Sequence, residues 1–596
     1  MTLLVHVWSF TPAFCQIWIE PDHQVNGPNG PDGEPNTPHD DNPLNGTFKT
    51  QFEPWIAAHP WQLGVVFGAW NDYSRTEEFR SDGLGTSNPN VSDPPPWTHD
   101  LVVDIERPPP PAQQWRQNQA DPGCAIGRNG MFYQCGVDWI QGIALRVYFA
   151  RALTGSGTQG WDVGFISGAG DESLDIPKVT VDSDPQRMNR VYLLWAPGDG
   201  VNFTIMFGRD ASSGDGWIFG GAPAHDLSDP NVPTAIKKGP VGGVGPGGEF
   251  YVAWFQRNQP PGGGGPRIMF NGTNDPFPAS EPLVFFGPTT IVSGFDSIEN
   301  GLTRSRTNLD GLVTYPGIGV DVSGCLFQGR IYVVYAEEDG NNLTPNFVKV
   351  LVGQPQPSGP PTWSGPYRVN WDAPGHSLQW HPAIVVDGKG RIGVMWYDTR
   401  LGDSQNLDRQ RYDVFFSYSV DGGVTWSKNH RVTQESSDPA TGDTRRIKIG
   451  EYAGIAAQGD SFYLMWMDLS RWNHAFAVQA GDIFATRIDV TAWPDFDDDC
   501  DVDAVGDYAF FQSCFSGSGN PFPPGCGNAD FDADGDVDLA DFSIFQLYLS
   551  GSDSCTCAGR AGQESFTDDG GLTWYTRTVL RTRLRDHCTA NNILFR

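Results

Sequence analysis

The chain has 596 residues, several times what one hydrophobic core needs, so we expect one large domain and a smaller one. Its formal net charge of -32 excludes nucleic acid as a partner, because such binding depends on Lys and Arg that neutralise phosphates. No apolar run approaches the roughly 20 residues of a transmembrane helix, so no membrane span is predicted.

The first 45 residues are mildly apolar at the start, without a basic stretch, and then rich in Pro, Asn and Asp. We interpret residues 1–45 as a leader or irregular segment. From residue 46 to 492 the chain combines turn formers with aromatic residues, and long helical periodicity does not occur before residue 500. This mixture favours many short strands, so the body is predicted to be all-β.

One template recurs through this body: an anchor residue, a short β-branched run, a Gly-rich turn and an aromatic strand that often ends in Trp. "HPAIVVDGKGRIGVMWYD" from His381 is a clear copy. The seven anchors are Pro54, Pro122, Pro177, Pro240, Pro316, Pro382 and Tyr452. They lie 55 to 76 residues apart, which is room for about four strands per unit. Radial repetition of such sheets predicts a six- or seven-bladed β-propeller, and the anchor count favours seven.

Two cysteines flank the turn of the second copy. Cys124 and Cys135 enclose "AIGRNGMFYQ", which predicts a hairpin with a cross-strand disulfide, although two free buried thiols are the alternative. Further along the chain, Cys500, Cys514 and Cys526 crowd one short region together with the pair at 555 and 557. This placement favours an oxidising compartment.

The stretch "SVDGGVTW" follows the sixth copy, where the outer hairpin of a blade has to turn. Gly422 and Gly423 can supply the positive φ of the bend, Asp421 and Thr425 can bond to turn backbone, and Trp426 can pack beneath. The stretch matches the Asp-box S-x-D-x-G-x-T-W at every fixed position. A second copy is "TDDGGLTW" at 567–574, and "RDASSGDGWIF" at 209–219 is a degenerate third.

On these residues the body resembles the sialidase-type (neuraminidase) β-propellers. The resemblance implies a glycoside hydrolase of exo-sialidase type with an arginine triad, an Asp acid/base and a Tyr nucleophile activated by Glu. The early F/Y-R-I-P motif that supplies one of those arginines does not occur in this sequence.

The candidate catalytic residues are an Asp and an Arg after the second strand of three copies, together with one Tyr. They are Asp72, Arg75, Asp398, Arg400, Asp468, Arg471 and Tyr452. The alternative is structural. Motifs repeated on several blades usually serve the fold, whereas a catalytic centre is unique, so each Asp would brace neighbouring blades. Tyr452 stands beside Glu451, but adjacent residues on a strand point to opposite faces, which counts against direct pairing.

A module at residues 493–558 is intensely acidic, with no Lys or Arg from 495 to 558. "DFDADGDVDLAD" places carboxylates at positions 1, 3, 5, 7, 9 and 12 of a calcium-binding loop and Gly535 at position 6. A partner copy starts 35 residues earlier with Cys500 in place of the Gly. The predicted Ca²⁺ ligands are Asp530, Asp532, Asp534, Asp536, Asp538 and Asp541 in one loop, and Asp495, Asp497, Asp499, Asp501, Asp503 and Asp507 in the other.

A short amphipathic helix is predicted after each loop, from "DYAFFQSCFSG" and "DFSIFQLYLSG". A calcium loop followed by one helix, duplicated, resembles the type I dockerin domain. The resemblance implies one or two Ca²⁺ ions and a cohesin-type protein partner. Without such a partner the module would serve as a stabilising or surface-attachment appendage.

The tail, residues 559–596, carries the second Asp-box and is basic, and we expect a hairpin there that completes a blade or an aberrant end. Three functions stay open. The chain is a secreted or cell-surface glycan-active propeller, a non-catalytic carbohydrate- or protein-binding propeller, or a structural surface component. The side chains that converge at the axis of the ring would distinguish them.

Overall fold

The computed structural model describes the chain in segments. These are residues 16–19, 23–24, 49–60, 65–74, 80–87, 97–100, 119–140, 143–152, 161–167, 173–187, 190–198, 203–210, 213–214, 224–228, 235–258, 265–274, 284–295, 309–310, 313, 315–324, 327–338, 347–371, 377–402, 411–439, 447–459, 461–470, 481–491, 496, 506–523, 526, 529 and 536–546.

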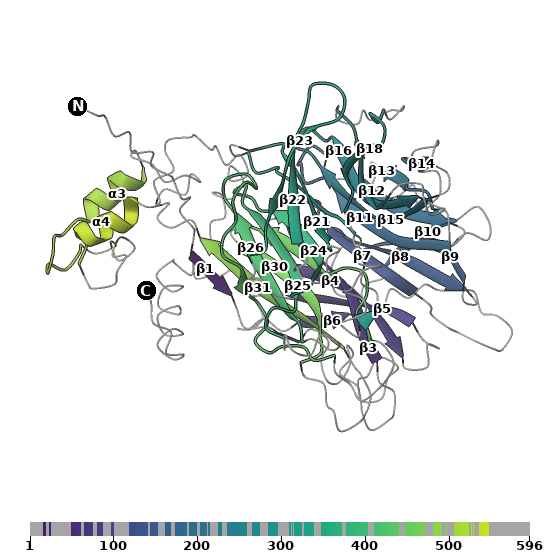
Figure 1. Ribbon diagram of the computed structural model, residues 1–596, viewed down its shortest axis with the longest axis horizontal. Coiled ribbons are helices and arrows are strands. Elements are labelled where there is room, and N and C mark those ends of the chain that lie inside the picture. Colours follow the sequence, from purple (N-terminus) through teal and green to yellow (C-terminus); the bar gives the residue numbers. More distant parts are fainter. Residues whose placement is uncertain are drawn as a thin grey trace.

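Seven antiparallel sheets form the body, and the predicted β-propeller is confirmed (Figure 1). We number these sheets as blades 1 to 7 in chain order. Blade 1 consists of β3(Lys49–Ala58), β4(Val66–Ser74), β5(Arg80–Ser87) and β6(Trp97–Asp100). Blade 2 consists of β7(Gln119–Ile126), β8(Phe132–Ile140), β9(Ile143–Ala152) and β10(Asp162–Ser167). Blade 3 consists of β11(Ser173–Val181), β12(Val191–Gly198), β13(Met206–Asp210) and β14(Ala224–Asp226).

Blades 4 to 6 have the same order of strands. Blade 4 consists of β15(Ala235–Val244), β16(Phe250–Asn258), β17(Arg267–Gly272) and β18(Thr289–Ser293). Blade 5 consists of β20(Gly317–Val320), β21(Ile331–Glu337), β22(Phe347–Gln354) and β23(Thr362–Arg368). Blade 6 consists of β24(Gln379–Val386), β25(Ile392–Asp398), β26(Asp413–Ser419) and β27(His430–Arg431). Outside the blades, β19(Leu309–Asp310) pairs in parallel with β28(Ile447–Lys448).

Blade 7 contains strands from both ends of the propeller. β29(Gly454–Gln458), β30(Ser461–Asp468) and β31(Asp482–Thr491) are joined by β1(Gln16–Ile19) and β2(His23–Gln24), which both pair with β31. The expectation that residues 1–45 are irregular is therefore wrong for these two strands: the free edge of β31 offers backbone groups, and "QIWI" pairs with them. The tail with its second Asp-box lies outside the described residues.

The innermost strands form a closed ring. β3 lies next to β7, and β11, β15, β20, β24 and β29 follow in turn until β29 packs against β3 again. At this last junction a Cβ on Gly454 would come within 2.8 Å of the Ile56 backbone nitrogen, so the two blades meet backbone to backbone. Ring closure turns the unpaired edge of each innermost strand toward the axis.

The core consists of apolar layers between neighbouring blades. The second strands are buried along their length, as in β12, β25 and β30, because each is covered by a blade on both faces. Large aromatic side chains fill the layers: Trp254, Trp380, Trp396 and Trp466 are each fully buried. The recurring aromatic strand of the sequence is therefore the core of each blade.

The Asp-box forms the predicted turn after β26. Gly422 and Gly423 have φ values of 73° and 88°. Asp421 accepts hydrogen bonds from the Thr425 backbone nitrogen at 2.9 Å and the Thr425 hydroxyl at 2.6 Å, and Trp426 is buried. The degenerate copy forms a similar bend, with Ser213 at 59°, Gly214 at 89° and the Gly214 nitrogen bonded to Asp210 at 2.8 Å.

The predicted Cys124–Cys135 disulfide is wrong: both cysteines are buried and not disulfide-bonded. In the pairing of β7 with β8, Cys124 faces Gln134 and Cys135 faces Gly123. Residues directly opposite each other share a face and neighbours along a strand do not, so the two thiols lie on opposite faces of blade 2. A disulfide does occur between Cys514 and Cys526 in the acidic module.

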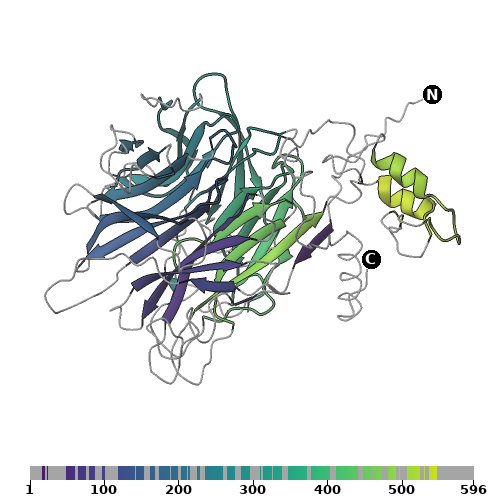
Figure 2. The same cartoon turned by 180° about the vertical axis from the view of Figure 1, so that it is seen from behind.

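The two helices predicted in the acidic module are present, α3(Asp507–Cys514) and α4(Leu539–Phe545). They pack through Phe511 and Phe545, whose ring centroids are 5.2 Å apart. Both views place the helices apart from the sheets (Figures 1 and 2). Among the helices of the described segments, none is long and apolar enough to cross a membrane.

We predict that Asp421→Ala lowers the free energy of unfolding by about 1–3 kcal/mol, because it removes the acceptor of several turn hydrogen bonds. Urea unfolding measures the effect. Asp162→Ala is the control, since its side chain is 60% exposed and its ion pair with Arg151 contributes at most about 1 kcal/mol. Equal losses in both variants would contradict a special role for the Asp-box.

Candidate functional site

The residue before the anchor proline adopts a left-handed backbone in five of the innermost strands. The φ values are 58° at Glu53, 58° at Asp121, 43° at Ile176, 60° at Gly239 and 45° at His381. In each of these strands the register with the second strand shifts at the same place, which marks a β-bulge. Such bulges redirect side chains, and non-glycine residues hold this strained conformation where the surroundings impose it.

Charged residues from five blades and one tyrosine meet at the level of these bulges and form what we call the axial cluster: Glu53, Asp121, Asp175, Lys178, Lys238, Glu451 and Tyr452. Its outer part is partly exposed. Lys238 forms an ion pair with Asp175, whose side chain is 17% exposed. The electrostatic field of Glu451 in blade 7 also reaches Lys238 in blade 4, so the groups face one another across the axis.

Asp121 and Asp175 form a carboxyl pair in this outer part. Burial raises the pKa of Asp175; Lys238 opposes the rise, and Asp121 adds to it through its charge and a hydrogen bond between the two carboxyls. The backbone nitrogen of Asp121 donates to the Asn71 side-chain oxygen at 3.0 Å, which fixes the bulge. Asp175 therefore keeps its proton to higher pH than an ordinary aspartate does.

Lys178 lies beneath the pair and is 3% exposed. Its Nζ donates to the Pro122 carbonyl at 3.1 Å and lies 3.5 Å from the centroid of the Tyr452 ring and 4.6 Å from that of Trp55. Burial lowers the pKa of Lys178 to about 8, against the attraction of Cys135, Asp121 and Glu53. This ammonium group connects blades 1, 2, 3 and 7 at the axis.

Tyr452, a predicted catalytic residue, belongs to this inner part. Its hydroxyl donates to the Pro122 carbonyl at 3.0 Å, and its ring packs edge-on against Trp55. The side chain is 8% exposed. Tyr452 thus lies at the axis, with its hydroxyl directed to the backbone.

Asp398 and Asp468 occupy equivalent places at the ends of β25 and β30. Asp398 accepts from the Trp396 indole at 2.8 Å, and Asp468 from the Trp466 indole at 3.1 Å. Gln256 accepts the corresponding bond from Trp254 at 3.4 Å. Because an amide can take this place, the contact itself supports the bracing alternative for these aspartates.

Arg400 folds back over blade 6 rather than toward the axial cluster. Its guanidinium donates to Asp398 at 2.5 Å and to Asn429 at 3.0 Å and lies 4.2 Å from the centroid of the Phe415 ring. Of the remaining candidates, Asp72 lies on β4. The Asp72 side chain, Arg75 and Arg471 lie outside what the structure describes, and the catalytic roles of all seven candidates stay predictions.

The acids and lysines of the axial cluster were missed by the sequence analysis, except that Glu451 was noted beside Tyr452. Most of them lie at or next to the residue before an anchor: Glu53 and Asp121 directly, Asp175 and Lys238 one position earlier. The anchors themselves were recognised because they recur. Aligning the repeats and searching for positions that differ between blades would have found these residues.

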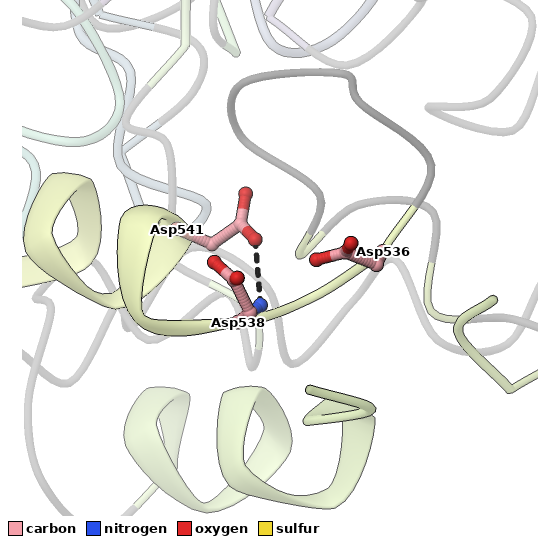
Figure 3. A group of neighbouring side chains, drawn as sticks. All are labelled: Asp536, Asp538 and Asp541. Carbon is pink, nitrogen blue, oxygen red and sulfur yellow. Dashed lines mark hydrogen bonds between the residues drawn. The ribbon is translucent and has the colours of Figure 1, made fainter. Parts of the chain in front are cut away.

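The second of the two predicted calcium loops is described in part. Asp536, Asp538 and Asp541 each place a carboxylate oxygen within 4.8 Å of the others. Asp541 also accepts the Asp538 backbone nitrogen at 2.8 Å (Figure 3). Three carboxylates at this separation suit a hard cation such as Ca²⁺. Asp530, Asp532 and Asp534 lie outside the described residues.

In the first loop, Asp507 is described. Its carboxylate is fully buried at the start of α3 and accepts the Phe496 backbone nitrogen. Asp541 holds the equivalent place at the start of α4. Asp495, Asp497, Asp499, Asp501 and Asp503 fall in segments that the structure leaves undescribed.

No family model matches the sequence, and no curated protein does. Similar solved structures include an ulvan lyase, with 11% sequence identity, 73% of this chain and 93% of that chain covered, and a TM-score of 0.41. An α-L-arabinanase of Penicillium chrysogenum in complex with arabinobiose has 11% identity, coverage of 62% and 92%, and a TM-score of 0.37. A Hadza microbial sialidase has 11% identity, coverage of 70% and 76%, and a TM-score of 0.35. The fold assignment rests on the strand pairing of this chain itself.

We predict a pH-dependent contribution of Lys178 to stability. The fold favours the neutral amine, so this contribution is complete above the ordinary pKa near 10.5 and is lost as pH falls to about 8. As pH rises from about 8 to 10.5, the free energy of unfolding of the wild type should rise by about 3 kcal/mol relative to that of Lys178→Met. Denaturant unfolding at pH 7 to 10.5 measures it. The exposed Lys428→Met is the control, and a flat difference for Lys178→Met would refute the assignment.

Proposed function

We propose that this chain is a secreted glycan-active β-propeller, a glycoside hydrolase that binds a sugar ring at the axial cluster and cleaves the bond beside it. The carboxyl pair Asp121–Asp175 is the observation that carries the proposal. Among the charged groups of the described segments, these two carboxyls lie together at the axis. The Asp175 side chain is partly exposed there, so a ligand can reach it. Secretion is supported by the Cys514–Cys526 disulfide, since disulfides persist in oxidising compartments.

The proposed chemistry uses two carboxyl groups in different protonation states. Asp175, whose pKa is raised, donates its proton to the leaving glycosidic oxygen. Glu451, across Lys238 from Asp175, acts as the carboxylate that activates water or stabilises the positive sugar ring. Lys238 positions Asp175 through their ion pair.

A sialidase-type hydrolase is the narrower form of this proposal. It requires a cation for the carboxylate of the substrate, and Lys238 is the partly exposed cation of the axial cluster. The expected Tyr nucleophile would be Tyr452, whose hydroxyl donates to Pro122 and lies beneath the pair. Ulvan and arabinan are further substrates to test, since the similar solved structures include an ulvan lyase and an arabinanase.

A non-catalytic carbohydrate-binding propeller is the second candidate. The observation that favours it concerns Lys178 and Tyr452. Both donate a hydrogen bond to the Pro122 carbonyl, and a group bonded in this way is less available to a reaction. In that case the axial cluster would bind a glycan and leave it unchanged.

We predict turnover of a glycan by the wild-type chain and a loss of about 10²–10⁴ in kcat for Asp175→Asn, with binding retained. The panel contains a sialoside, arabinan, ulvan and xylan, and the readouts are released sugar and affinity electrophoresis. Turnover should fall as pH rises through the pKa of Asp175, because the acid then loses its proton. Asp162→Asn is the exposed control.

Three outcomes decide between the alternatives. Binding without turnover of any glycan supports the second candidate. Loss of turnover in Asp398→Asn with full activity in Asp175→Asn moves the reaction to the strand-end pairs. Neither binding nor turnover rejects carbohydrate as the ligand.

We further propose that the acidic module is dockerin-like, binds one or two Ca²⁺ ions and tethers the propeller to a cohesin-type protein or another surface partner. The ligands would be the predicted aspartates of both loops. The clustered oxygens of Asp536, Asp538 and Asp541 support the second site. Because these carboxylates repel one another, cation binding would contribute directly to folding of the module.

We predict that calorimetric titration of the full chain with Ca²⁺ gives a binding heat, and that the triple variant Asp536→Asn, Asp538→Asn, Asp541→Asn loses the part from the second loop. A chelator should lower the unfolding temperature of the helical module and leave the transition of the propeller in place. Asp162→Asn serves again as control. No heat in the wild type would end the calcium proposal.

A further inference from the structure

Trp371 is a large apolar side chain on the surface, 63% exposed, three residues after the end of β23. Most Trp side chains of the described blades are core residues, so this one is an exception. Leu401, after β25, is also exposed, at 51%. We call Trp371, Arg400, Leu401 and Asn429 the edge patch.

The backbone that carries Trp371 is fixed on both sides. The preceding residue, Asn370, is buried, and its side-chain oxygen accepts the Val348 backbone nitrogen at 2.9 Å. The Trp371 backbone nitrogen donates to the Asn429 side-chain oxygen at 2.6 Å, and the Asn429 amide donates to the Val369 carbonyl at 3.0 Å. An exposed ring on a backbone held in this way loses little conformational freedom when a ligand binds.

A charged group shares an acceptor with the Trp371 backbone. The Arg400 guanidinium donates to the same Asn429 oxygen that accepts the Trp371 backbone nitrogen, and it also contacts Asp398 and the rings of Phe415 and Trp396. The arginine of a predicted catalytic pair is thereby linked through Asn429 to the backbone of an exposed tryptophan. Polar groups therefore lie near the segment that carries the indole.

The edge patch and the axial cluster open to the same face of the propeller. Strands alternate in direction within each blade, so the second and fourth strands end on the face where the innermost strands begin. Trp371 follows the fourth strand of blade 5, and Arg400 follows the second strand of blade 6. Asp121 and Asp175 lie near the beginnings of β7 and β11.

We propose that Trp371 is a remote sugar-binding subsite, on which one ring of a polysaccharide stacks while another part of the same chain occupies the axial cluster. The inference rests on the glycan-active function proposed above. A sugar ring has one apolar face and a polar rim, which matches an exposed indole with Arg400 and Asn429 near the segment that carries it. A protein partner would need about 800 Å² on this surface, far more than one indole and one leucine provide.

Affinity electrophoresis of the full-length protein in gels containing arabinan, ulvan or xylan tests the subsite, with a short oligosaccharide of the same polymer as competitor. We expect Trp371→Ala to weaken binding of the polymer about tenfold and Trp371→Phe to weaken it less. Affinity for a trisaccharide, which reaches one subsite only, should be unchanged. Val424→Ala, an exposed apolar residue in the Asp-box turn on the opposite face, is the matched control.

Each result has a separate meaning. Equal retardation of wild type and Trp371→Ala overturns the subsite and leaves the proposed function standing. Equal weakening by Trp371→Ala and Val424→Ala overturns it too, because the effect is then not local. If the wild-type chain is retarded by no polymer, the glycan-active function fails and the subsite fails with it.

Discussion

Seven innermost strands around one axis impose the constraint on which this structure depends. Each strand has to pack against two neighbours, and the last has to meet the first, as Gly454 meets the backbone at Ile56. The bulge before the anchor proline occurs where these strands crowd together. In five of these strands the bulge places a residue with positive φ directly before the anchor proline, at the same level of each blade.

Burial at the axis then determines the chemistry. Lys178 is tolerated there because a carbonyl, two aromatic rings and nearby carboxylates compensate its charge. The same crowding brings Asp121 and Asp175 together and makes ionisation of Asp175 costly. The raised pKa of Asp175 is therefore a consequence of crowding at these two positions, and it is also what the proposed acid catalysis requires.

The fold could be predicted from the sequence more readily than the candidate site, for a physical reason. The propeller, the Asp-box turn and the two helices follow from patterns that repeat, because each blade or loop solves the same packing problem. Glu53, Asp121 and Glu451 each stand directly before an anchor, but the other four repeats have different residues there, so the recurring template does not mark the charge. Cys124 and Cys135 show a further limit: their spacing suits a hairpin, but the turn from Gly127 to Met131 sets the register, and register decides the face of each side chain.

The two faces of the propeller use their polar groups differently. On the Asp-box face, the Asp421 carboxylate accepts hydrogen bonds from the backbone and hydroxyl of Thr425 in its own turn. The Asp210 carboxylate likewise accepts one from the Gly214 backbone nitrogen. On the opposite face, Asp175 and Lys238 pair with each other while both stay partly exposed. Turn-bound carboxylates stabilise the blade and have little capacity left for a ligand. The charged groups of the axial cluster therefore stay accessible in a way that these two turn-bound aspartates do not.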